Sequence, residues 1–191
     1  MHRRIVLAGL LGGLVLLVWT FVVNGLLGFQ ARLDMKQLPE ERQVYELLRE
    51  QVTEPGRYVC NPAVTAERRF PDHEPAFSIL YGGVGHEAAG RHMLFGLVIF
   101  LAMPILAAWL LGHASERLLR SYPRKLCFFV GLGLLLAVLA DLGRFGIAAY
   151  PLGDALQLAA ARLLSWTLVG AVVAALVRPS AAPARADVAG A

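Results

Sequence analysis

The stretch "LLLAVLADLGRFGIAAYP", residues 134–151, places an aspartate and an arginine three residues apart in a run of Leu, Ala and Gly. The apolar run at residues 126–140 has 15 residues, which would make a helix about 22 Å long. A membrane-spanning helix needs about 20 residues. The sequence therefore predicts a spanning helix that continues through Asp141 and Arg144 and carries both charges into the apolar layer.

The composition places the whole chain in the membrane class. Hydrophobic residues make up 57% of the 191 residues, and the mean hydropathy is +0.58, which is too apolar for a soluble domain. The formal charge is +4, but no cluster of Lys and Arg is long enough to bind nucleic acid, so we exclude that partner. Sixteen of the 18 basic residues are Arg among abundant Ala, Leu and Gly, which favours a GC-rich bacterial gene and a bacterial inner membrane.

Three further runs are long enough to span a bilayer. Ile5–Leu27 follows "MHRR" and exceeds the 7–15 apolar residues of a signal peptide, so we predict an uncleaved anchor. Met93–Leu111 is the second span, and Ala155–Val177 is the last. Asp154, with Gln157 three residues later, predicts an N-cap for the last span.

The charges of the connecting segments predict the orientation. The loop at residues 112–125 holds four basic residues against Glu116, and "MHRR" is also basic, so both face the cytoplasm. Residues 28–92 hold eight basic and ten acidic residues and face the other side. The predicted fold is an all-α membrane domain of four transmembrane helices with a small α/β insert between helices 1 and 2. Its predicted order is cytoplasmic residues 1–4, span 5–27, extracytoplasmic 28–92, span 93–111, cytoplasmic loop 112–125, span 126–149, external turn 150–154, span 155–177 and a disordered cytoplasmic tail 178–191.

Charges within the predicted spans need a partner, because each costs about 2.5–3.5 kcal/mol to insert. Asp141 lies nine residues before Tyr150 and Arg162 lies eight after Asp154, which puts both about 12–14 Å below one surface of an antiparallel hairpin. We therefore predict a polar cluster of Asp141, Arg162 and the neighbouring Arg144. Three interpretations stay open: a structural ion pair, a site on an ion or proton path, and arginines that reach the headgroups.

The extracytoplasmic segment shows its own pattern. Residues 39–53 predict an amphipathic helix with Val44, Leu47, Leu48 and Val52 on one face. "RYVC" at residues 57–60 and "AFSILY" at residues 76–81 predict two strands of a hairpin. About 65 residues without a disulfide or a structural metal make a fold of marginal stability. We therefore expect this segment to pack on the membrane surface or on a partner protein.

No catalytic constellation is evident. "HEAAG" begins at His86 like a zinc-protease motif, but position 90 is Gly where the second His is required. We predict no metal and no cofactor. Cys60 and Cys127 fall on opposite sides of the predicted membrane, so no internal disulfide is expected. An external metal site is a minor alternative to an ordinary solvated loop, and its residues would be Cys60, His73, Glu74, His86 and Glu87. His92 completes the predicted external polar site, but it lies six residues after His86, about 240° around a helix, so the two rings would not converge on one metal.

Small residues four apart favour close helix packing. Gly9 and Gly13 form one such pair in the first span, and Gly170 and Ala174 form another in the last. Packing within the chain is the leading interpretation, and self-association into a homo-oligomer is the alternative.

Three segments resemble a family of small bacterial membrane proteins. They are "LPEERQVYELL" at residues 38–48, "PGRYVCNP" at 55–62, and "SWTLVGAVVAALV" at 165–177 after "AYPLGDAL". The family has a Gly-rich amino-terminal anchor, an external LPxE…PGxY segment and a closing span with Trp before GxVxA. The resemblance implies the architecture and assigns no activity.

These features favour a non-enzymatic membrane protein that docks, assembles or senses through its extracytoplasmic segment, with the lipid bilayer and a membrane or periplasmic protein as partners. The alternative is a small oligomeric transport subunit that uses Asp141, Arg144 and Arg162. A membrane enzyme acting on lipid or quinone is a third class, supported only by the external His and acidic residues.

Overall fold

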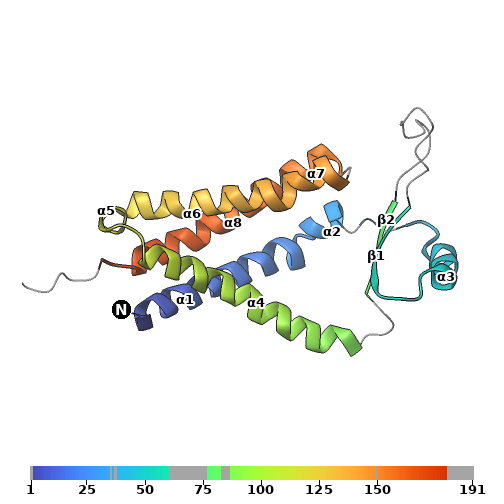
Figure 1. Ribbon diagram of the computed structural model, residues 1–191, viewed down its shortest axis with the longest axis horizontal. Helices are drawn as coiled ribbons and strands as arrows, with labels where there is room; N and C mark the ends of the chain where they lie inside the picture. The colour runs from blue at the N-terminus through green and yellow to red at the C-terminus, as the bar shows by residue number, and fades with distance from the viewer. Residues whose placement is uncertain are drawn as a thin grey trace, which may run out of the picture. The chain divides into compact units, whose positions relative to one another are not determined.

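The structure is a computed structural model, and it describes residues 2–34, 36, 38–60, 77–82, 87–148 and 150–179. The chain divides into two compact units. One unit consists of Met1–Leu33 and Met93–Ala191, and we call it the bundle; the other, Asp34–His92, we call the insert. Figure 1 shows both units, which are described separately below.

The bundle is built from long apolar helices. Among the described residues, four helices are long and apolar enough to span a membrane: Arg3–Leu26, Leu94–Gly112, Tyr122–Phe145 and Leu152–Leu176. The helical elements of the bundle are α1 (His2–Thr20), η1 (Phe21–Leu26), α2 (Phe29–Asp34), α4 (Glu87–Gly112), α5 (Glu116–Leu119), α6 (Tyr122–Leu136), η2 (Ala137–Leu142), α7 (Gly143–Ala148) and α8 (Leu152–Leu176).

Two elements of this series, η1 and η2, are π-helical, a conformation that is rare and occurs mostly as single turns inside α-helices. The helix that starts at Tyr122 runs through η2 and ends at Ala148, so it carries Asp141 and Arg144 within its length. The apolar run alone would have been too short to span, and the charged residues extend it.

The buried residues of α6 and η2 recur every four positions. In an α-helix of 3.6 residues per turn, a row with this spacing drifts by about 40° per step and forms a ridge inclined to the helix axis. A neighbouring helix that crosses at an angle packs along such a ridge. The row stays on the side that faces the neighbouring helix α8. It consists of Lys125, Phe129, Gly133, Ala137 and Asp141.

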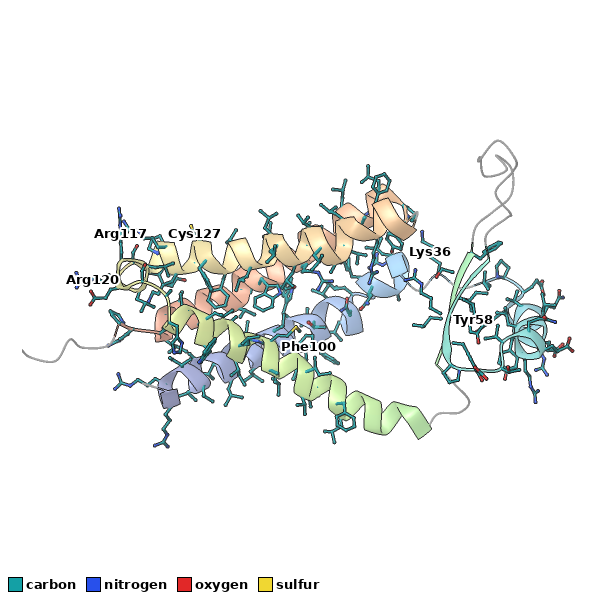
Figure 2. All side chains as sticks on the ribbon, in the orientation of Figure 1. Lys36, Tyr58, Phe100, Arg117, Arg120 and Cys127 are labelled. Atoms are coloured by element: carbon teal, nitrogen blue, oxygen red, sulfur yellow. The ribbon has the colours of Figure 1, made fainter. Side chains whose placement is uncertain are left out.

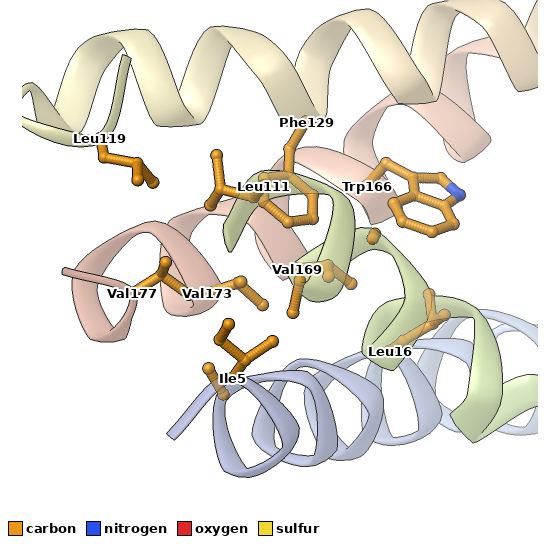
Figure 3. Close-up of a cluster of buried hydrophobic side chains, with 12 residues drawn as sticks. Ile5, Leu16, Leu111, Leu119, Phe129, Trp166, Val169, Val173 and Val177 are labelled. Carbon is orange, nitrogen blue, oxygen red and sulfur yellow. The ribbon is translucent and has the colours of Figure 1, made fainter. Parts of the chain in front are cut away.

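Helix α8 is the central helix of the bundle, since it packs along both α6 and α1. Its fully buried Val169 and Val173 belong to the apolar core with Phe129 of α6 and Leu111 of α4. Figure 3 shows these side chains gathered between the four helices. Trp166 stacks on Phe129 with ring centroids 6.4 Å apart.

Glycines allow the helices to approach closely. A Cβ atom on Gly9 would lie 2.5 Å from the Ile105 Cα, and one on Gly13 would lie 2.9 Å from the Leu101 Cδ2, so both face α4. A Cβ atom on Gly170 would overlap Phe129. The small-residue positions singled out in the sequence therefore pack within the chain. A larger side chain at Gly9 or Gly170 would require the neighbouring helix to move, whereas at Gly13 a shift of the Leu101 side chain would make room.

Helix α8 begins earlier than the sequence predicts. It starts at Leu152 rather than Ala155, with Pro151 as its N-cap residue and no side-chain cap hydrogen bond. Asp154 lies inside the first turn, where a carboxylate still favours the positive end of the helix dipole. The predicted cap at Asp154 is wrong because Pro151, with φ fixed at −56°, already places the chain for the first turn.

The residues of the insert that the structure describes ahead of α4 form a helix and a hairpin. Its elements are α3 (Glu41–Gln51), β1 (Gly56–Cys60) and β2 (Phe77–Tyr81). The two strands are antiparallel, and the register runs from Gly56 opposite Tyr81 to Cys60 opposite Phe77. Across the strands, Arg57 Nε donates to Ser78 Oγ at 2.9 Å. The helix begins at Glu41 and not at Pro39, which lies in the preceding turn.

Candidate functional sites

A buried ion pair joins η2 to α8. Arg162 Nε lies 2.5 Å from Asp141 Oδ2, and Arg162 Nη2 donates to Asp141 Oδ1 at 2.9 Å. The Asp141 side chain is 1% exposed and that of Arg162 is 38% exposed. The structure thus brings together two of the three residues of the predicted polar cluster in a bidentate pair, the strongest arrangement for an arginine and a carboxylate.

The geometry of the pair suits a structural role. Both carboxylate oxygens accept a hydrogen bond from the same guanidinium, so the Asp141 charge is compensated where the side chain has no access to solvent. Removing one partner of such a pair leaves an uncompensated buried charge, which costs far more than the intact pair contributes. This arrangement agrees with the structural interpretation of the cluster, in which the pair fixes how α8 packs on the preceding helix.

Arg144, the third residue of the predicted cluster, lies in α7 and is exposed. Its guanidinium carbon is 5.9 Å from the centroid of the Tyr150 ring, a cation–π distance. The Tyr150 hydroxyl donates to the Leu33 carbonyl at 2.8 Å, which ties the start of α8 to the end of α2. Arg144 thus lies at the end of the bundle that holds Tyr150, which we call the polar end, and not in the interior of the bundle.

A second polar contact was not predicted from the sequence. Trp19 Nε1 of α1 donates to Ser165 Oγ of α8 at 3.1 Å, and Ser165 Oγ donates to the Ala161 carbonyl at 2.7 Å. Ser165 follows Arg162 by three residues, so the hydroxyl lies about one turn from the ion pair. A Trp in the first span and a Ser in the last are visible in the sequence, and the two side chains are able to form a hydrogen bond. The sequence does not show that they meet, because that depends on how α1 packs on α8.

Lys125 was predicted as a charge of the cytoplasmic loop, and the structure gives it a different environment. The side chain is buried, and its Nζ donates to the Val177 carbonyl at 2.8 Å. Val177 is the C-cap residue of α8, so the ammonium satisfies a carbonyl that has no partner within the helix. The contact fastens the end of α8 to the start of α6.

The predicted external polar site falls largely outside the described residues. His73, Glu74 and His86 lie outside them, as do the side chains of Cys60, Glu87 and His92. Among the residues that are described, no three His, Cys, Asp or Glu side chains come together as metal ligands. Cys127 is an exposed free thiol near α5 (Figure 2).

The described part of the insert leaves several of its large apolar side chains exposed. Leu47 of α3 is 64% exposed, Tyr45 is 61% exposed, and Leu80 of β2 is 82% exposed. Val52 is the one buried residue among those described here. A two-stranded hairpin and a helix of 11 residues thus provide little core of their own.

Comparisons with protein-family models, with curated proteins and with solved structures found no match to this chain. The resemblance to small bacterial membrane proteins therefore stays a prediction. Function is inferred below from the geometry of the chain itself.

Proposed function

We propose that the chain is a multi-pass protein of the bacterial inner membrane, with both termini in the cytoplasm, and that it docks or senses another protein through its extracytoplasmic insert. The observation that carries this proposal is the exposure of large apolar side chains on the insert, above all Leu47 and Leu80. A surface of this kind is typical of an interaction site.

Exposed apolar residues on the bundle support the membrane location. They occur on every long helix, including Leu14 of α1, Ile99 of α4, Leu139 of η2 and Leu164 of α8. Lipid would cover such a band. One end of the bundle carries the basic loop with Arg117 and Arg120, visible in Figure 2, which supports placing that end in the cytoplasm.

The charges of the insert favour a protein partner over the headgroup layer. Helix α3 carries three acidic and two basic residues, so an anionic membrane surface would not attract it. Its exposed Leu47 and Tyr45 lie on opposite edges of the apolar face, beside the partly buried Val44 and Leu48. We infer a partner that presents an apolar protein surface of its own.

A cysteine-accessibility experiment tests the membrane topology. Cys60 and Cys127 are replaced by Ser, and single cysteines are introduced by Tyr45→Cys in the insert or Arg117→Cys in the loop. In intact spheroplasts, a membrane-impermeant maleimide should label the Tyr45→Cys protein, and the Arg117→Cys protein should react only after permeabilisation. Equal labelling of both before permeabilisation would contradict the proposed threading.

Photocrosslinking in native membranes tests the docking function. A photoreactive amino acid replaces Leu47 on the apolar face of α3 or, as the control, Arg42 on the charged face of the same helix. We expect one protein adduct that forms from position 47, is absent from position 42 and disappears when Leu80→Glu is added. Adducts to lipid alone, or to a second copy of this chain, would overturn the docking proposal.

The transport alternative gains no support from the site geometry. Both oxygens of Asp141 are engaged by Arg162, and Arg144 lies at the polar end of the bundle. A carboxylate on an ion path would instead need access to the permeating ion. The ion pair is therefore assigned to the architecture of the bundle.

A further inference from the structure

A groove between the first turns of α1 and the last turn of α8 combines two arginines with an apolar wall. Arg4 and Arg178 come from helices at opposite ends of the sequence, and Leu7, Ala8, Ala175 and Leu176 complete the lining. Both arginines are exposed, and among the described residues no acidic side chain pairs with either of them. Within the described residues, two positive charges thus lie beside one groove without an acidic partner.

This combination points to a specific ligand. A guanidinium binds phosphate oxygens with two parallel hydrogen bonds, which makes arginine a preferred phosphate ligand. An apolar wall adds nothing for a free phosphate ion, but it suits the first methylenes of an acyl chain. Exposed Leu7, Leu11 and Leu14 continue the apolar surface along α1 away from the arginines.

The position of the groove strengthens the argument. It lies beside the C-cap of α8, where the Lys125 ammonium already occupies the Val177 carbonyl next to Arg178. The same end of the bundle holds the basic loop. Glu116 of this loop is already paired, since its Oε2 lies 3.2 Å from Arg120 Nη2. Basic pockets between membrane helices on the cytoplasmic side are suited to anionic lipid headgroups.

We propose that the groove binds one anionic phospholipid, with its phosphate between Arg4 and Arg178 and an acyl chain along Leu7. The lipid bridges the start of α1 and the end of α8, two segments that are far apart in the chain. The proposal rests on the membrane location given under the proposed function, and it is independent of the docking partner.

Native mass spectrometry of the delipidated full chain in detergent tests this site. Phosphatidylglycerol and phosphatidylcholine are titrated separately against the wild type and against the double variant Arg4→Gln, Arg178→Gln. We expect the wild type to prefer phosphatidylglycerol and the variant to bind it about 30-fold more weakly, since each basic residue near a headgroup contributes about a factor of five. The control is Arg117→Gln, Arg120→Gln, which removes the same charge from the same end and should retain the affinity.

Three results would overturn the proposal. They are equal binding of the two lipids, an equal loss in the control variant, and displacement of phosphatidylglycerol by inorganic phosphate at a similar concentration, which would indicate a phosphate site without lipid. Carbonate extraction of native membranes is measured in parallel. Release of the chain by carbonate would contradict the membrane location, whereas retention with no lipid preference would contradict this inference alone.

Discussion

The bundle and the insert expose large apolar side chains for different reasons. In the bundle, the exposed residues surround a shared interior made by Leu111, Phe129, Val169 and Val173. In the insert, the exposed residues stand beside charged ones, and Val52 alone is buried among the residues described there. The first pattern describes a unit that packs on itself, and its exposed apolar residues agree with the proposed membrane location. The second agrees with the proposal that the insert docks another protein.

An exposed apolar side chain therefore has to be interpreted together with the residues that are buried beside it. Helices in a membrane gain little from hiding apolar surface, so close packing and buried polar pairs decide how they associate. The bundle shows both, at Gly9 against α4 and at Asp141 with Arg162. The part of the insert that the structure describes shows neither, and this contrast agrees with the proposal that the bundle provides stability and the insert provides recognition.

The largest expected effect comes from breaking the ion pair. Arg162→Met alone should lower the free energy of unfolding by about 3–5 kcal/mol, because it leaves the buried Asp141 carboxylate without its partner. Asp141→Val alone should cost less, because the Arg162 side chain that it leaves is 38% exposed. The double variant should return to within about 1 kcal/mol of the wild type, since no charge is then left uncompensated. Unfolding by dodecyl sulfate in mixed micelles measures all three. Single variants as stable as the wild type would mean that the pair does not hold the bundle together.

Crowding the contact between α1 and α4 with a larger side chain should have the next largest effect on the free energy of unfolding. Gly9→Leu forces side-chain atoms toward the Ile105 backbone and should cost about 1–3 kcal/mol. Gly131→Leu is the matched control, because nothing lies within 4 Å of a Cβ atom at that position. The same unfolding assay compares the two variants. Equal losses would show that α1 and α4 do not pack as described.

Removing the buried ammonium should have a smaller effect. Lys125→Met keeps the length of the side chain but loses the hydrogen bond to Val177, which should cost about 1–2 kcal/mol. The thermal midpoint in detergent reports the change, with Arg117→Met as the exposed control. If both substitutions gave the same midpoint as the wild type, Lys125 would have no capping role.

The smallest effect is expected in the insert. Leu80→Ser replaces a side chain that is 82% exposed, so the free energy of unfolding should change by less than about 0.5 kcal/mol. The same variant should weaken the protein adduct formed from position 47. A large loss of stability with an unchanged adduct would reverse the assignment of roles to the two units.

Several features were predictable because they depend on local spacing alone. Run lengths and hydropathy predict four membrane-length helices, and the structure confirms that number within the described residues. Alternation and turn residues predict both strands, which form a hairpin of β1 and β2. Counting residues from the turn at Tyr150 places Asp141 and Arg162 at one depth, and their depth matches because every helical residue adds the same rise.

Other features depend on helices that are distant in the chain. The number of membrane-length helices, the identity of the apolar residues and the place of the basic loop follow from the sequence alone, because each depends on neighbours within a few turns. Only the tertiary structure decided that α8 is central, that Gly9 faces α4 rather than another copy, and that Lys125 caps α8. The groove with Arg4 and Arg178 belongs to the same group, since its residues meet only after the helices have packed.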